Sequence, residues 1–193
     1  MTDGDPCFLS IAEAASLIGA KQISPVELTR AYLDRIERLN GTLHVYVQVL
    51  HDEALAAARA AEAEIMAGRY RGPLHGIAIG LKDIYDTAGI PTEGGSKSCL
   101  GRIPAKDATT TRLLKEAGAV LLGKLTTWEF AIGGTAFDTP FPPAQPLEHR
   151  ARPRRVIERV GRGRRGRSLR DGDGQRHRWL DPLAGGMVRA CWP

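Results

Sequence analysis

Long apolar runs are missing from the sequence, and cysteine is scarce. No apolar stretch approaches the roughly 18 residues that cross a membrane, so we expect no spanning helix and no membrane partner. The first residues, MTDGDPCFLS, lack the basic start of a secretory signal peptide, which favours a cytoplasmic protein. The three cysteines, Cys7, Cys99 and Cys191, lie far apart and are odd in number. They suit neither a disulfide framework nor a zinc site.

Lysine is absent after Lys124, whereas arginine is plentiful there. Residues 144–193 hold 13 Arg against 5 acidic residues, a net charge of +8, and the rest of the chain carries −3. The sequence pI near 9.4 therefore reflects this final segment. We expect residues 1–143 to form a folded domain. We expect residues 144–193, which show no apolar period, to be a disordered arginine-rich tail.

The beginning of the chain has the pattern of helices. A serine followed three residues later by glutamate, the capping-box pattern, occurs twice: Ser10 with Glu13, and Ser24 with Glu27. Gly41 is expected to end the second helix in the left-handed position that follows a helix. An alanine-rich third helix is expected over residues 52–68, because alanine has the highest helix propensity.

The next part of the chain has the pattern of a strand, a helix and a second strand. A short apolar run at 77–81 between glycines predicts a buried strand that ends at Lys82. Asp107 is the expected N-cap of a helix to Glu116, Gly118 follows that helix, and a strand is expected at 119–122. A crossover of this kind joins parallel strands, so the sequence predicts an α/β fold, a sheet covered by helices.

Lys82 is the main candidate for chemistry in this region. A lysine at the end of an apolar strand can lose its charge by desolvation and act as a general base near neutral pH. The alternative is a solvated lysine that pairs with Asp83 or Asp86, which is the more common environment of lysine.

Three further sites have weaker patterns. The segment GGSK at 94–97 is either an anion-binding turn or an ordinary turn. His75 has no second histidine at ligand spacing and fits the start of a strand better than a metal site. Glu129 is either a buried acceptor or a surface carboxylate. No metal or organic cofactor is expected from these residues.

Two segments carry a resemblance to a known family. The segments GIAIGLKD and ATTTRLLKEAGAVLLGK, within a likeness that covers about residues 8–144, resemble the amidase signature family. The resemblance implies a mixed sheet covered by helices, of which 1–143 is the N-terminal part. It implies a hydrolase of C–N amide bonds that needs no cofactor and acts on a small-molecule amide. It also implies a Ser–cis-Ser–Lys mechanism in which Lys82 is the catalytic lysine.

The two serines of that mechanism are absent where the family has them. The family continues after the FPPA loop with NPW and two glycine- and serine-rich motifs, whereas this chain continues QPLEHRARPRRVIERVG. We therefore expect the chain as written to be truncated as an amidase and inactive. An arginine-rich segment without lysine is typical of GC-rich codons read one base out of frame. Read from the second base of each codon, residues 145–148, 153–159 and 176–182 can spell NPWN, PGGSSSG and DTGGSIR. The recovered serines fall opposite Val156 and Leu180.

A different function remains open for the tail. A small protein whose basic tail binds RNA or another polyanion would show the same charge. The segment has few aromatic residues for base stacking, only Trp179 and Trp192. The sequence determines neither the amide substrate nor the oligomeric state.

Overall fold

A computed structural model of the chain describes residues 5–132, 140–142 and 144. The predictions made for residues 145–193, including disorder and the missing serine motifs, lie outside this range, as does Cys191. Within the described part, Cys7 is buried and Cys99 is half-buried.

Both predicted capping boxes are present. A short 3₁₀ turn, η1 (Pro6–Phe8), precedes α1 (Ile11–Gly19) and α2 (Pro25–Leu43). Ser10 and Ser24 each accept a hydrogen bond from the backbone of the glutamate three residues later, and each glutamate accepts the N–H of its serine. These bonds satisfy N–H groups that the first turn of a helix leaves without partners.

The predicted end of the second helix was wrong. Gly41 does not end α2, because the helix continues to Leu43, and His44 takes the left-handed conformation with a φ of 52°. The Asn40 side chain accepts from the N–H of Tyr46 and donates to its carbonyl, which turns the chain into the first strand. These longer-range contacts, and not the local glycine, decide where the helix stops.

A three-stranded mixed sheet forms the centre of the described fold. The strands are β1 (Tyr46–Val49), β2 (Ala78–Lys82) and β3 (Val120–Leu125), in the order β1-β3-β2. The β2–β3 pair is parallel, as the crossover pattern predicted, and β1 runs antiparallel to β3. The sequence analysis did not predict β1. The α/β class and the mixed sheet with helices are confirmed.

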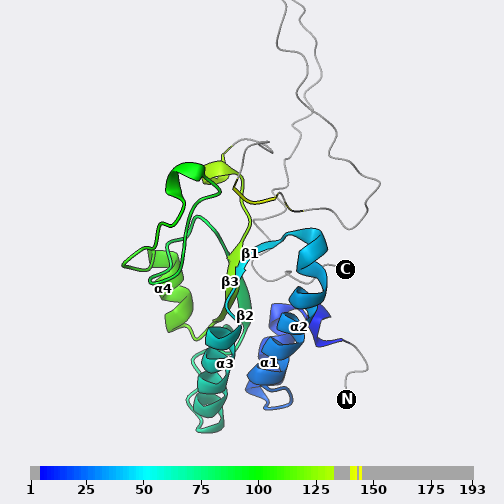
Figure 1. The fold of residues 1–193 in the computed structure, drawn as a ribbon. Helices are drawn as coiled ribbons and strands as arrows, with labels where there is room; N and C mark the ends of the chain where they lie inside the picture. Colours follow the sequence, from blue (N-terminus) through cyan, green and yellow to red (C-terminus); the bar gives the residue numbers. More distant parts are fainter. Residues whose placement is uncertain (1–4, 133–139, 143, 145–193) are drawn as a thin grey trace, which may run out of the picture.

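The helices lie on the two sides of this sheet. Figure 1 shows α1 and α2 on one side of the sheet and α4 (Thr109–Glu116) on the other. The alanine-rich helix α3 (His51–Met66) presents a face of small residues, including the fully buried Ala54 and Ala58, to the core that it shares with α2 and β3. Small side chains let this helix approach closely, so alanine here contributes packing as well as helix propensity.

The crossover helix also differs from its predicted start. Ala108, not Asp107, is the N-cap of α4. The carboxylate of Asp107 instead accepts the N–H of Ala88 at 2.7 Å and pairs with Lys115 at 2.9 Å. Gly118 follows the helix with a φ of +83°, as predicted. In the part of the chain that the structure describes, no helix has the length and apolar character needed to cross a bilayer.

Candidate active site

Lys82 is the last residue of β2, at the carboxyl end of the parallel pair. It is half-buried and lies opposite Leu125 of β3. The next residue extends the ladder, because the N–H of Asp83 donates to the carbonyl of Leu125 at 2.9 Å, and Tyr85 N–H donates back to the Lys82 carbonyl at 3.0 Å. The backbone at Lys82 is therefore fixed by two hydrogen bonds, one from the following residue to β3 and one from Tyr85 to the Lys82 carbonyl.

Within residues 5–132, 140–142 and 144, no counter-ion lies close to the side chain of Lys82. Among the residues that the structure describes, no hydrogen-bond or ion-pair partner contacts its ammonium group. The alternative environment, an ion pair with Asp83 or Asp86, is not observed. Asp83 faces Lys124 and accepts the N–H of Glu93, and Asp86 is paired with Arg102 at 2.7 Å.

Lys124 is a buried lysine that the sequence analysis missed. It lies on β3 beside Leu81, and none of its surface is exposed. Its ammonium donates to the carbonyl of Tyr85 and to the hydroxyls of Thr87 and Thr92, at 2.5, 3.2 and 2.8 Å. The sequence signal was a lysine inside the apolar run AVLLGKL, the same signal that singled out Lys82.

Burial controls the charges around this second lysine. It lowers the pKa of Lys124, and the attraction of Asp83 and Asp86 offsets only part of that shift. Burial likewise raises the pKa of Asp83, against the effects of the Glu93 N–H and of Lys124. The Asp83 Oδ1 atom lies 3.7 Å from the Lys124 ammonium. The Arg102 guanidinium holds the pKa of Asp86 below its usual value.

The GGSK segment is a turn that closes over the end of β2. Gly94 and Gly95 have φ values of +63° and +65°, and the Gly94 N–H donates to the Asp83 carbonyl. The buried hydroxyl of Ser96 donates to Glu129 at 2.7 Å. Glu129 is therefore an exposed residue that still accepts a hydrogen bond from the interior, a combination that neither sequence alternative described.

His75 lies in the core just before β2. Its Nδ1 accepts the N–H of Arg71 at 3.1 Å, its Nε2 lies 3.4 Å from Glu64, and its ring stacks on Tyr70. Burial, together with the charge of Arg71, lowers its pKa, and Glu64 opposes that shift. His75 is thus bonded to Arg71, close to Glu64 and stacked on Tyr70 within the core. No group of three or more side chains that could hold a metal ion occurs among the described residues.

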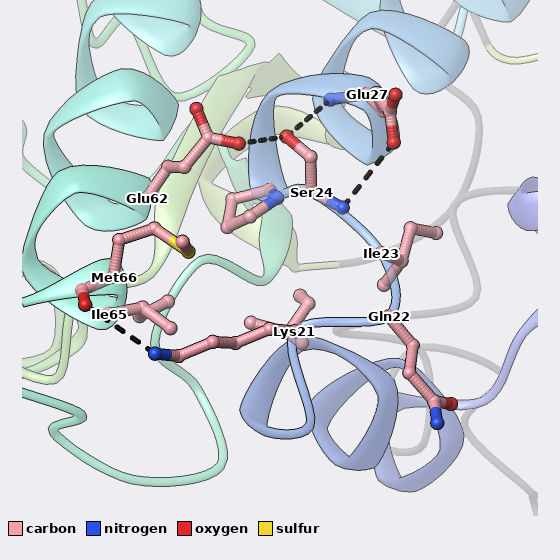
Figure 2. Close-up of a pocket in the computed structure, with 10 residues that line it drawn as sticks. Lys21, Gln22, Ile23, Ser24, Glu27, Glu62, Ile65 and Met66 are labelled. Carbon is pink, nitrogen blue, oxygen red and sulfur yellow. Dashed lines mark hydrogen bonds between the residues drawn. The ribbon is translucent and has the colours of Figure 1, made fainter. Parts of the chain in front are cut away.

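A small hollow lies between the α1–α2 turn and α3, with a volume of about 200 Å³ (Figure 2). Ser24 donates to Glu62 at 2.5 Å on its wall, and Lys21 donates to the carbonyl of Met66. The hollow contains none of the candidate residues. The Lys21, Ser24 and Glu62 side chains on its wall are already hydrogen-bonded across the two helices and the turn, which is the arrangement of a helix–helix junction.

Comparison with known proteins identifies the family. The amidase family model matches residues 27–149. The A subunit of a glutamyl-tRNA(Gln) amidotransferase from Acidothermus cellulolyticus is 43% identical over 133 residues, which are 69% of this chain and 26% of the relative. The corresponding protein from Anaeromyxobacter sp. strain K is 37% identical over 183 residues, 95% of this chain and 36% of the relative. That second alignment therefore includes much of the arginine-rich segment.

Solved structures agree with this likeness. The peptide amidase from Stenotrophomonas maltophilia has a TM-score of 0.60 and 37% identity over 64% of this chain and 26% of that one. Fold and sequence together define an α/β protein and point to a single family. The chain belongs to the amidase family. It spans about a quarter to a third of the length of the curated relatives that it matches.

Proposed function

We propose that the chain is the N-terminal part of an amide hydrolase in which Lys82 is the proton acceptor. The observation that carries the proposal is a half-buried lysine, at the carboxyl end of a parallel strand, without an acidic partner among the described residues. A lysine that is not neutralised by a carboxylate can exchange a proton with a serine hydroxyl.

The chemistry follows from the family mechanism. The lysine amine takes a proton from a bridging serine, which takes the proton of the nucleophilic serine. The nucleophilic oxygen bonds to the amide carbon, the C–N bond breaks, and the amine leaves with the returned proton. Water then releases the acid. In an amido-transfer reaction, water would still release the acid, and the ammonia set free in the first step would go to a second, activated acceptor. The substrate proposed is a small-molecule amide.

The two serines would come from the reading frame one base away from residues 145–182. In that frame the bridging and nucleophilic serines would fall opposite Val156 and Leu180, which are 24 positions apart. The chain as written contains neither motif, so we propose that it is an inactive, truncated form. Loss of the nucleophile in a serine hydrolase reduces turnover by about 10⁶-fold.

The test compares the chain as written with the product of the same gene in the restored frame. The nucleotide sequence comes first: codons of 145–182 that do not spell the motifs would overturn the frame proposal. With an aryl amide as substrate, the restored protein should turn over and the chain as written should not. Lys82→Met should reduce the restored activity at least 10³-fold. Lys106→Met, at an exposed lysine, is the matched control and should leave it unchanged. Activity that survives Lys82→Met would refute the role of Lys82.

A second candidate function rests on the net charge of +8 in residues 144–193 and on the alignment that includes them. A chain with this charge should bind RNA or another polyanion with an affinity that falls steeply with salt. The measurement is retention on heparin between 50 and 200 mM salt, with residues 1–143 as the control. Retention by residues 1–143 alone would show that the tail is not the binder.

A further inference from the structure

The segment that follows Lys82 is fastened to the sheet by Lys124. The chain leaves β2 at Asp83 and reaches the Gly94 turn, and three of its residues accept hydrogen bonds from the one buried ammonium. The Lys124 side chain thus fills the space between β3 and this segment. Neighbouring residues of a strand point to opposite faces, so Lys124, paired with Leu81, lies on the face opposite to Lys82.

Four polar groups of this segment lie around this single cation. The Tyr85 carbonyl, the buried hydroxyls of Thr87 and Thr92, and the buried carboxylate of Asp83 all surround it. A buried polar group that loses its partner carries the full cost of desolvation. Removal of one partner of a buried ion pair is more costly than replacement of both. Without the ammonium, Asp83 Oδ1 would lose its charged neighbour, and the two threonine hydroxyls would keep only their bonds within the segment, from Thr87 to the Tyr85 carbonyl and from Thr92 to the Ile90 carbonyl. We therefore expect the segment to shift.

The path of this segment sets the position of Lys82. Asp83 is covalently joined to Lys82, and the Tyr85 N–H donates to the Lys82 carbonyl. Tyr85 is therefore bonded to both lysines, to one through its N–H and to the other through its carbonyl. A displacement of Tyr85 moves the end of β2.

We propose that Lys124 is a positioning residue for Lys82, which fixes the end of β2 and so the direction of the catalytic ammonium group. The assignment of catalysis to Lys82 rests on the proposed function. The positioning itself is a property of the described residues and can be measured without turnover.

The test uses reductive methylation of the full chain with ¹³C-formaldehyde. Accessible lysines become dimethyl-lysines, and the resonance of Lys82 is identified by its absence in Lys82→Arg. Lys124→Met removes the ammonium at similar volume. We expect the Lys82 resonance to move by more than its line width, whereas that of the exposed Lys106 stays in place. An unchanged Lys82 resonance would overturn the proposal.

Two further variants separate positioning from a general loss of stability. Val120→Ala destabilises the same strand by emptying a fully buried site that makes none of the Lys124 contacts, and it should leave the Lys82 resonance unchanged. An equal movement in Val120→Ala would overturn the proposal. Thr92→Val removes one acceptor at constant shape and should move the resonance in the same direction by a smaller amount. If Lys124→Met does not fold, the Lys82 resonance in Thr92→Val serves as the test of positioning instead, and an unchanged resonance there would overturn the proposal.

The outcome is independent of the proposed function. A restored-frame enzyme that stays active without Lys82 would refute catalysis by Lys82 and would leave the resonance test of positioning intact. Conversely, an unmoved resonance would refute positioning by Lys124 while Lys82 could still be the base.

Discussion

Two substitutions of glycine by alanine should change the stability of this fold in opposite directions: Gly41→Ala should raise the free energy of unfolding, and Gly118→Ala should lower it. Gly41 lies inside α2 with no atom within 4 Å of the place that an added Cβ would take, and its φ is not left-handed. Alanine is favoured over glycine in a helix by about 0.5–1 kcal/mol. At Gly118 the φ is +83°, and a Cβ would lie 2.3 Å from Cδ2 of the buried His75. A left-handed conformation costs alanine about 1–2 kcal/mol, and overpacking adds about 1–3 kcal/mol.

The assay is urea unfolding followed by far-ultraviolet circular dichroism. With a slope of about 2 kcal/mol per M, Gly41→Ala should raise the midpoint by about 0.3–0.5 M, and Gly118→Ala should lower it by about 1–2.5 M. A lower midpoint for Gly41→Ala would refute the reasoning. It would mean that Gly41 is in the left-handed position after the helix, as its sequence context predicts.

Three other substitutions test the packing. Gly123→Ala would place a Cβ 2.1 Å from the carbonyl oxygen of Gln48, so it should push β1 away from β3 and cost about 2–4 kcal/mol in urea unfolding, because the hydrogen bonds between the two strands weaken. A loss below about 1 kcal/mol would contradict the close approach. Burial lowers the pKa of His75 below its unfolded value of about 6.5, so the unfolded chain takes up the proton first, and stability should fall as the pH drops below about 6.5, with a slope of at most about 1.4 kcal/mol per pH unit. Urea midpoints measured at pH 7.5 and 5.5 should depend less on pH in His75→Gln than in the unchanged chain. An equal dependence would exclude His75 as the cause. Asp107→Ser should cost about 1–2 kcal/mol, because serine cannot reach the N–H of Ala88; an unchanged midpoint would indicate that Asp107 acts as an N-cap, where serine serves equally well.

Local patterns predicted the parts of the fold that depend on neighbours in sequence. The capping boxes at Ser10 and Ser24 need only a serine and a glutamate three residues apart, so they were confirmed at the predicted residues. The strand ending at Lys82 and the helix ending before Gly118 were likewise confirmed, since an apolar run between glycines marks the strand and Gly118 marks the end of the helix. The strand β1 was missed. Its four residues have little periodicity, and only its pairing with β3 makes it a strand.

The candidate site divides in the same way. Lys82 could be selected from the sequence because it ends an apolar strand within a family motif, and its role as a base stays a prediction. The residues that pair with the sequence neighbours of Lys82 could not be predicted from the sequence. Asp83 is adjacent to Lys82 in sequence, yet its carboxylate faces Lys124, which is 41 positions later. Strand alternation turns adjacent side chains to opposite faces of the sheet, and parallel pairing brings distant ones together.

By itself, the sequence determined the α/β class, the amidase family and the change of composition after residue 143, because these depend on local pattern and on resemblance. Only the tertiary structure decided that α2 passes Gly41, that Asp107 holds Ala88 and that Lys124 is the buried cation beneath the segment after Lys82. The first depends on a bond between residues six positions apart, and the other two on partners 19 or more positions apart in the chain. The partner that each group takes depends on which buried polar groups would otherwise lack a hydrogen bond. This can be known only when the pairing of the strands is known.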